Sequence, residues 1–260
     1  MAPISNGNGA NFADSAGTPW EGRQFEHNDW GADDGTAPEK LIEAIRRFRS
    51  RDVGETEVVD ALRESRLLVP LIAQLGEAGT NDHGHTVDKS QELSIVTVSG
   101  PDGRNVLPAF TSVEAMQAWN ADARPVPVAA TRVALAAASE STDLVVLDPT
   151  SVTEFVIRRP ALWAIAQSEP WVPSYLDPTV ESAVTDAAAG VAHVRRVSLQ
   201  PGDPDSRLAG PELVVRVALE AGLDAQSLRD VSAQVQQRLA LNETITARVD
   251  SLTIRLEAAS

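Results

Sequence analysis

The sequence contains no cysteine, only four histidines, and aromatic residues at just 4% of its 260 positions. Without a thiol, the chain cannot form disulfides, thiolate nucleophiles, cysteine-ligated zinc sites or iron–sulfur clusters. Basic residues are also scarce, with 22 Lys and Arg against 37 Asp and Glu and a net charge of −15. This balance argues against general nucleic-acid binding, because phosphate contacts require clustered Lys and Arg.

Long apolar runs are missing as well. No stretch approaches the roughly 18 consecutive apolar residues of a membrane-spanning helix. The first residues combine neither the basic charge nor the apolar core of a secretory signal. We therefore expect a cytoplasmic protein with no membrane partner, and the lack of cysteine fits a reducing compartment.

Catalytic and cofactor motifs do not occur either. The sequence has no Gly-x-Ser-x-Gly elbow, no Walker A loop and no Gly-x-Gly-x-x-Gly fingerprint. The one metal-like cluster is His83 and His85 with Asp82 and Asp88 nearby, in a Gly-rich polar stretch that is more typical of a solvated loop. We expect no catalytic residue, no cofactor and no metal, and so a protein that is not an enzyme.

The first 38 residues differ from the rest in being rich in Gly, Asn, Asp and Ala, with one arginine among several carboxylates. Such a composition predicts an acidic, mostly disordered arm. Large side chains nevertheless punctuate it, and they make it a candidate docking arm: Trp20, Arg23, Phe25 and Trp30. The arm would dock on its own domain, bind a partner as a linear motif, or remain idle.

Residues 39–168 alternate between helical and strand-like patterns. Apolar residues at 93–98 and 106–110 flank a Pro-Asp-Gly turn, which predicts a β-hairpin. A capping box at 111–114 then starts a helix. Aromatic and basic residues gather around this hairpin and form a candidate interaction surface: Lys89, Phe110, Trp119 and Arg124. The alternative role of these residues is core packing and internal ion pairing.

Four arginines lie close together at positions 46, 47, 49 and 51, beside the apolar face of a predicted helix. The pattern is typical of the solvated face of an amphipathic helix. A contact with an acidic partner or RNA is the alternative.

A pattern change at 169–173 indicates a domain boundary, and residues 171–260 form the second domain. The expected order is a ragged strand at 171–175, a helix at 178–189, strands at 191–199 and 213–219, a long helix after Asp224 and a strand at 249–256. The order βαββαβ is that of a ferredoxin-like fold, so the whole chain belongs to the α+β class.

Several short blocks resemble one known family in the order in which they occur: residues 61–70, 88–90, 102–104, 107–111, 123–128 and 145–149. Through them, residues 40–165 resemble the N-terminal domain of the SseB family (enhanced serine sensitivity protein B), in the form found in actinobacteria. Residues 171–260 resemble the family's C-terminal domain, mainly in element order. The resemblance implies a cytoplasmic accessory protein whose name comes from a phenotype, and it carries over no catalytic residue.

These observations favour a non-enzymatic regulatory protein that acts through protein–protein interaction with an unknown partner, and they argue against nucleic acid as a ligand. A homo-oligomer remains open, because no pattern specifies the oligomeric state. The alternative function is a sensor that binds a small ligand such as an amino acid or metabolite, which rests on fold analogy.

Overall fold

The computed structural model describes residues 33–74, 92–95, 97–100, 103–139, 142 and 144–259. They belong to one unit, Asp33–Ser260, which is distinct from Met1–Ala32. The division into two domains near residue 170 stays a prediction. We refer to residues 33–168 as the N-terminal part and to residues 171–259 as the C-terminal part. The mixture of helices with both parallel and antiparallel strands confirms the α+β class.

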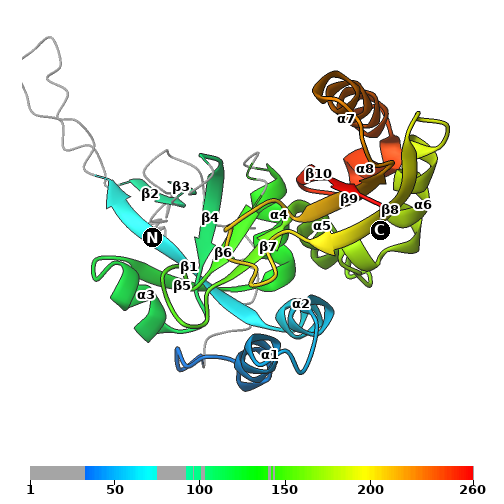
Figure 1. The fold of residues 1–260 in the computed structure, drawn as a ribbon. Coiled ribbons are helices and arrows are strands. Elements are labelled where there is room, and N and C mark those ends of the chain that lie inside the picture. The colour runs from blue at the N-terminus through cyan, green and yellow to red at the C-terminus, as the bar shows by residue number, and fades with distance from the viewer. Residues whose placement is uncertain are drawn as a thin grey trace, which may run out of the picture. The chain divides into compact units, whose positions relative to one another are not determined.

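The N-terminal part opens with two amphipathic helices. Leu41, Ile45 and Phe48 are buried on one face of the first helix, as their spacing predicts. The elements of this part are α1 (Glu39–Arg49), α2 (Glu55–Arg63), β1 (Arg66–Gln74), β2 (Glu92–Ile95), β3 (Val98–Ser99), β4 (Asn105–Ala109), α3 (Val113–Trp119), β5 (Arg124–Ala129), α4 (Ala130–Ser139), β6 (Leu144–Leu147), β7 (Phe155–Arg158) and α5 (Arg159–Gln167) (Figure 1).

Two sheets form among the described residues of this part, in the orders β2-β1-β5 and β3-β4-β6-β7. The expected hairpin is only partly present. Val98 pairs with Val106 across the turn, whereas β2 pairs with β1 instead, so that Leu71 lies opposite Ile95. A backbone bridge between Leu68 and Phe110 connects the two sheets.

A buried ion pair holds the first described residues against this part of the protein. Arg66, at the start of β1, donates to the carboxylate of Asp33 at 2.6 Å and to the carbonyl of Thr111 at 2.7 Å. Gly35 has φ +78° and accepts a hydrogen bond from the backbone N–H of Val113. A Cβ at Gly35 would come within 2.6 Å of Val113, so this close approach requires glycine. Residues 33–36 are thus packed against the sheet.

The C-terminal part consists of η1 (Ser174–Leu176), α6 (Pro178–Ala188), β8 (Val194–Pro201), β9 (Leu213–Leu219), α7 (Ala225–Ala240), α8 (Glu243–Arg248) and β10 (Leu252–Ala258). The strands form a sheet of order β10-β9-β8, with β8 antiparallel and β10 parallel to β9. Alternate residues of β9, from Leu213 to Leu219, pack against α6 and α7.

The ferredoxin-like prediction is wrong in its first strand. Residues 171–173 have no regular structure, and Ser174–Leu176 is a short 3-10 helix. Pro170 and Pro173 lack backbone N–H donors, which disfavours a ladder at this position. The observed order of helices and strands after this 3-10 helix is therefore αββααβ, and β10 pairs directly with β9.

Candidate functional site

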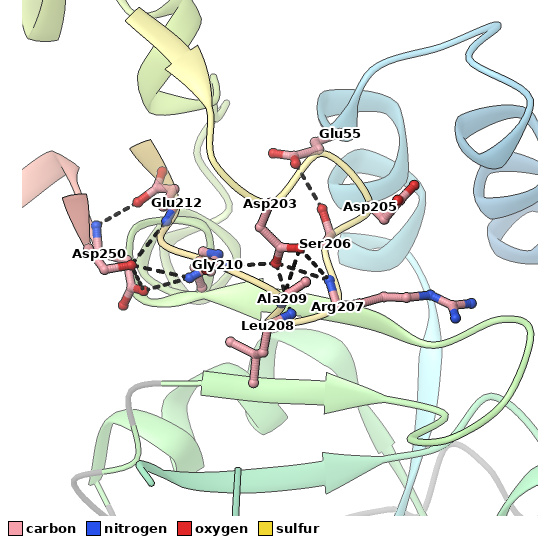
Figure 2. Close-up of polar contacts among 12 residues, drawn as sticks. Glu55, Asp203, Asp205, Ser206, Arg207, Leu208, Ala209, Gly210, Glu212 and Asp250 are labelled. Atoms are coloured by element: carbon pink, nitrogen blue, oxygen red, sulfur yellow. Dashed lines mark hydrogen bonds and ion pairs between the residues drawn. The ribbon is translucent and has the colours of Figure 1, made fainter. Parts of the chain in front are cut away.

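A loop of the C-terminal part, residues 202–211, lies on the edge of the N-terminal sheet (Figure 2). The backbone N–H of Val156, in β7, donates to the carbonyl of Ser206 at 2.8 Å. Leu208 is buried against a small apolar cluster that contains Val106 and Val146. The loop joins β8 to β9, so it ties the C-terminal part to the N-terminal sheet.

Asp203 holds this loop together from inside. Its carboxylate accepts the backbone N–H groups of Arg207 at 3.0 Å and Leu208 at 2.8 Å (Figure 2). It also accepts the Nη2 hydrogen of Arg158 at 2.7 Å, and both side chains of this ion pair are almost fully buried. A buried guanidinium requires such partners, because an unpaired charge away from water costs several kcal/mol.

Arg158 is the shared partner of two C-terminal carboxylates. Besides Asp203, it donates to Asp250 at 3.1 Å and to the carbonyl of Gly210 at 3.0 Å. Asp250 in turn receives Arg104 from the N-terminal part, with both oxygens 3.0 Å from Nη1. Two arginines of one part therefore converge on carboxylates of the other.

Two further carboxyl groups lie at this junction with altered acidity. Burial raises the pKa of Glu55 to about 7, although the Ser206 hydroxyl, which donates to Glu55 at 2.8 Å, opposes the shift. Burial also raises the pKa of Glu212, although the hydrogen bond that its carboxylate accepts from the backbone N–H of Asp250 opposes the shift. The enclosed space beside Glu55 has a volume of about 20 Å³, which accommodates one water molecule. This arrangement can take up a proton near neutral pH, beside a space that holds about one water molecule.

The arginine cluster of α1 partly belongs to this junction. Arg51 donates to the carbonyl of Pro204 and to the carboxylate of Asp205, both at 2.6 Å. Arg49 donates to backbone carbonyls of the same loop and of Glu154. These two arginines are thus bound within the protein, whereas Arg46 pairs with exposed Glu43 on its own helix.

A surface groove lies beside the junction, with a volume of about 360 Å³. It is lined by α5, by the segment that follows it, by the start of α6 and by the end of α8. Trp163 and Val172 are 42% and 46% exposed at this groove, and the guanidinium of Arg159 lies 5.2 Å from the Trp163 ring centre. Trp171 lines both the groove and the enclosed cavity. The groove therefore presents aromatic and proline surfaces to solvent.

The residues of the predicted interaction surface lie in different environments. Phe110 and Trp119 contact each other, with ring centres 5.3 Å apart, and Phe110 is fully buried. Arg124 is exposed at the start of β5, opposite Leu71. A contact of Trp119 or Arg124 with a partner stays a prediction, while the buried Phe110 packs inside the protein.

The remaining predicted residues lie outside the described residues. These are Lys89, the docking-arm residues Trp20, Arg23, Phe25 and Trp30, and the His83 and His85 pair. Across residues 33–259, as far as they are described, no three potential metal ligands gather in one place. None of the described helices has the length and apolar character needed to cross a membrane.

Sequence reasoning missed the junction residues Glu55, Arg158, Asp203 and Glu212. A signal was available in the turn residues at 201–205, Pro-Gly-Asp-Pro-Asp, because an aspartate in such a turn commonly accepts backbone N–H groups. Nothing local in the sequence pairs Asp203 with Arg158, which lies 45 residues away.

Comparison with known proteins identifies the N-terminal part. No curated protein and no solved structure matches the chain. Residues 40–164 match the family described as the SseB protein N-terminal domain, which spans α1 to α5. The match covers the segment in which the sequence blocks resembled that family. Residues 40–164 are thus an SseB N-terminal domain.

Proposed function

We propose that the protein is a non-enzymatic accessory protein of the cytoplasm that acts by binding another protein. The observation that carries the proposal is the groove at Trp163 and Val172, two large apolar side chains that remain substantially exposed. Tryptophan beside a groove is typical of interface anchors, which a partner buries on binding. Because Trp and Pro surfaces accommodate extended apolar chains, the occupant we propose is an extended segment rich in proline or aliphatic residues.

The buried carboxylates of the junction support a non-enzymatic role. Asp203 and Asp250 bind arginines and backbone groups of the chain itself, so their charges hold the fold. The enclosed cavity at Glu55 is water-sized, which favours a protein partner over an enclosed amino acid as ligand. A sequence without cysteine is consistent with the reducing cytoplasm.

Site-specific photo-crosslinking in a cell lysate tests this proposal. A photoreactive amino acid at position 163 is expected to give one discrete protein adduct. The same amino acid at position 152, where Val152 is 84% exposed outside the groove, is expected to give none. Excess purified wild-type protein added to the lysate before irradiation should compete the adduct away, and a Trp163→Ala competitor should not. Identical adducts from both positions, or none from position 163, would contradict the proposal.

A further inference from the structure

The sheet of the C-terminal part has one face that its helices leave open. Along β9, Leu213, Val215 and Val217 point into the core with α6 and α7. Strand side chains alternate between faces, so the residues between them point the opposite way. The polar side chains on that open face are Arg196, Ser198 and Gln200 of β8, Arg216 of β9, and Thr253, Arg255 and Glu257 of β10.

Strand register places three arginines close together on this face. Arg216 lies directly opposite Arg255 in the parallel pair β9–β10, and Ser198 lies opposite Arg216 on the other side. Arg196 lies in the next row, opposite Ala218. Neighbouring strands are about 4.8 Å apart, so the three guanidiniums cover a width of roughly 10 Å.

The arginines of this face are incompletely neutralised. Glu257 accepts the Nε hydrogen of Arg216 at 2.7 Å. Arg196 and Arg255 are exposed, and neither side chain has a hydrogen bond or ion pair with any part of the chain that the structure describes. Residues 171–260 hold eight arginines against twelve carboxylates, yet within β8, β9 and β10 the only carboxylate on this face is Glu257, and Glu220, which follows β9, pairs with Arg195. Positive charge is thus concentrated on one surface of an acidic protein.

We propose that the open face of β8, β9 and β10 binds a short acidic segment of a partner protein, with Arg196 and Arg255 as its carboxylate ligands. Guanidinium groups bind carboxylates in a bidentate manner, and a positive patch on an acidic protein steers an acidic partner to one place. Alternate residues of an extended segment lie about 7 Å apart, which matches the spread of the arginines. This face of β8, β9 and β10 carries no aromatic residue on which a nucleobase would stack. The lack of such a residue disfavours single-stranded nucleic acid as the ligand.

This inference rests on the proposed function in that it names the chemistry of a protein partner, and its test is separate from that of the groove. The probe is a short fluorescein-labelled peptide of alternating Glu and Ser, titrated with the full chain and followed by fluorescence anisotropy. The wild type should bind saturably and more weakly as salt is raised. The double variant Arg196→Gln/Arg255→Gln should bind at least tenfold more weakly.

The matched control is Arg46→Gln/Arg229→Gln, which removes the same charge from exposed positions on α1 and α7. This control should bind within twofold of the wild type, and the melting temperatures of all variants establish that they are folded. Equal loss in both double variants, or no saturable binding by the wild type, would overturn the proposal. So would equally tight binding, with the same arginine dependence, to an oligouridine or to phosphatidylserine vesicles. None of these outcomes affects the crosslinking test at position 163.

Discussion

Arg158 and Asp203 form a buried ion pair, with Nη2 2.7 Å from the carboxylate oxygen, between the last strand of the SseB domain and a loop near the middle of the C-terminal part. Only 8% of the arginine side chain and 1% of the aspartate side chain are exposed. Water therefore has little access to either side chain and cannot solvate one charge if the other is removed. We expect substitutions at this pair to destabilise the junction most.

Replacing Asp203 with Asn should lower the free energy of unfolding by about 3 kcal/mol, because Arg158 would remain buried without its full counter-charge. Urea denaturation followed by tryptophan fluorescence measures this change. The control is Asp205→Asn in the same loop, whose carboxylate is 54% exposed and pairs with Arg51. The Asp205→Asn substitution should lower the free energy of unfolding by less than about 1 kcal/mol. Equal effects of the two substitutions would refute a special role for the buried pair.

Glu55 should make the protein less stable as the pH rises. Its folded-state pKa of about 7 lies above the ordinary 4.5. The protonated folded form is therefore favoured, and this contribution is fully present below pH 4.5 and lost as the pH rises through 7. Relative to Glu55→Gln, the wild type should lose up to about 3 kcal/mol of unfolding free energy across that interval. Urea titrations at several pH values test this, with exposed Glu57→Gln as control. Parallel pH profiles of the wild type and Glu55→Gln would contradict the prediction.

Replacing Asp148 even with asparagine should destabilise the protein. Its buried carboxylate accepts the backbone N–H of Thr111 at 2.8 Å and the hydroxyls of Thr111 and Thr153, each at 2.7 Å. The backbone has φ +44°, which Asn tolerates, so Asp148→Asn isolates the loss of one acceptor oxygen. We expect a loss of about 2 kcal/mol in calorimetry or urea unfolding. An effect no larger than that of the exposed Asp122→Asn would count against this account.

Gly202 should not accept a methyl group. A Cβ there would lie 2.2 Å from the carbonyl oxygen of Pro211, a backbone atom that closes the opposite end of the loop. Gly202→Ala should therefore lower the free energy of unfolding by about 2 kcal/mol, seen as a drop of several degrees in the melting midpoint. Gly54→Ala serves as control, since its Cβ would meet nothing closer than 3.8 Å. A melting midpoint for Gly202→Ala that matches the control would refute the clash.

The sequence predicted elements whose signal is local. The period of Leu41, Ile45 and Phe48 located α1, and Asp224 does cap α7 through the backbone N–H of Ser227. Strand alternation, by contrast, does not say which neighbour a strand pairs with. Residues 92–95 therefore join β1 instead of extending the hairpin.

The junction could not be predicted for the same reason. The apolar residues around Trp171 suggested a strand, but Trp171 packs against the core and lines a cavity between the two parts. The polar loop at 202–211 has the composition of a solvated turn. Its contacts with Arg158 and Val156 could not be predicted, because these partners are distant in sequence. Such long-range pairing is fixed by tertiary packing and leaves little local trace.

The buried ion pair at Asp33 has a consequence for how this family segment can exist by itself. Arg66 and Arg158 both lie within residues 40–164, yet their carboxylate counterions Asp33, Asp203 and Asp250 all lie beyond its ends. A fragment trimmed to the family boundaries would contain two guanidiniums that have lost their counterions. In this chain, the segment that matches the family is therefore shorter than the segment that contains the counterions of its own buried arginines.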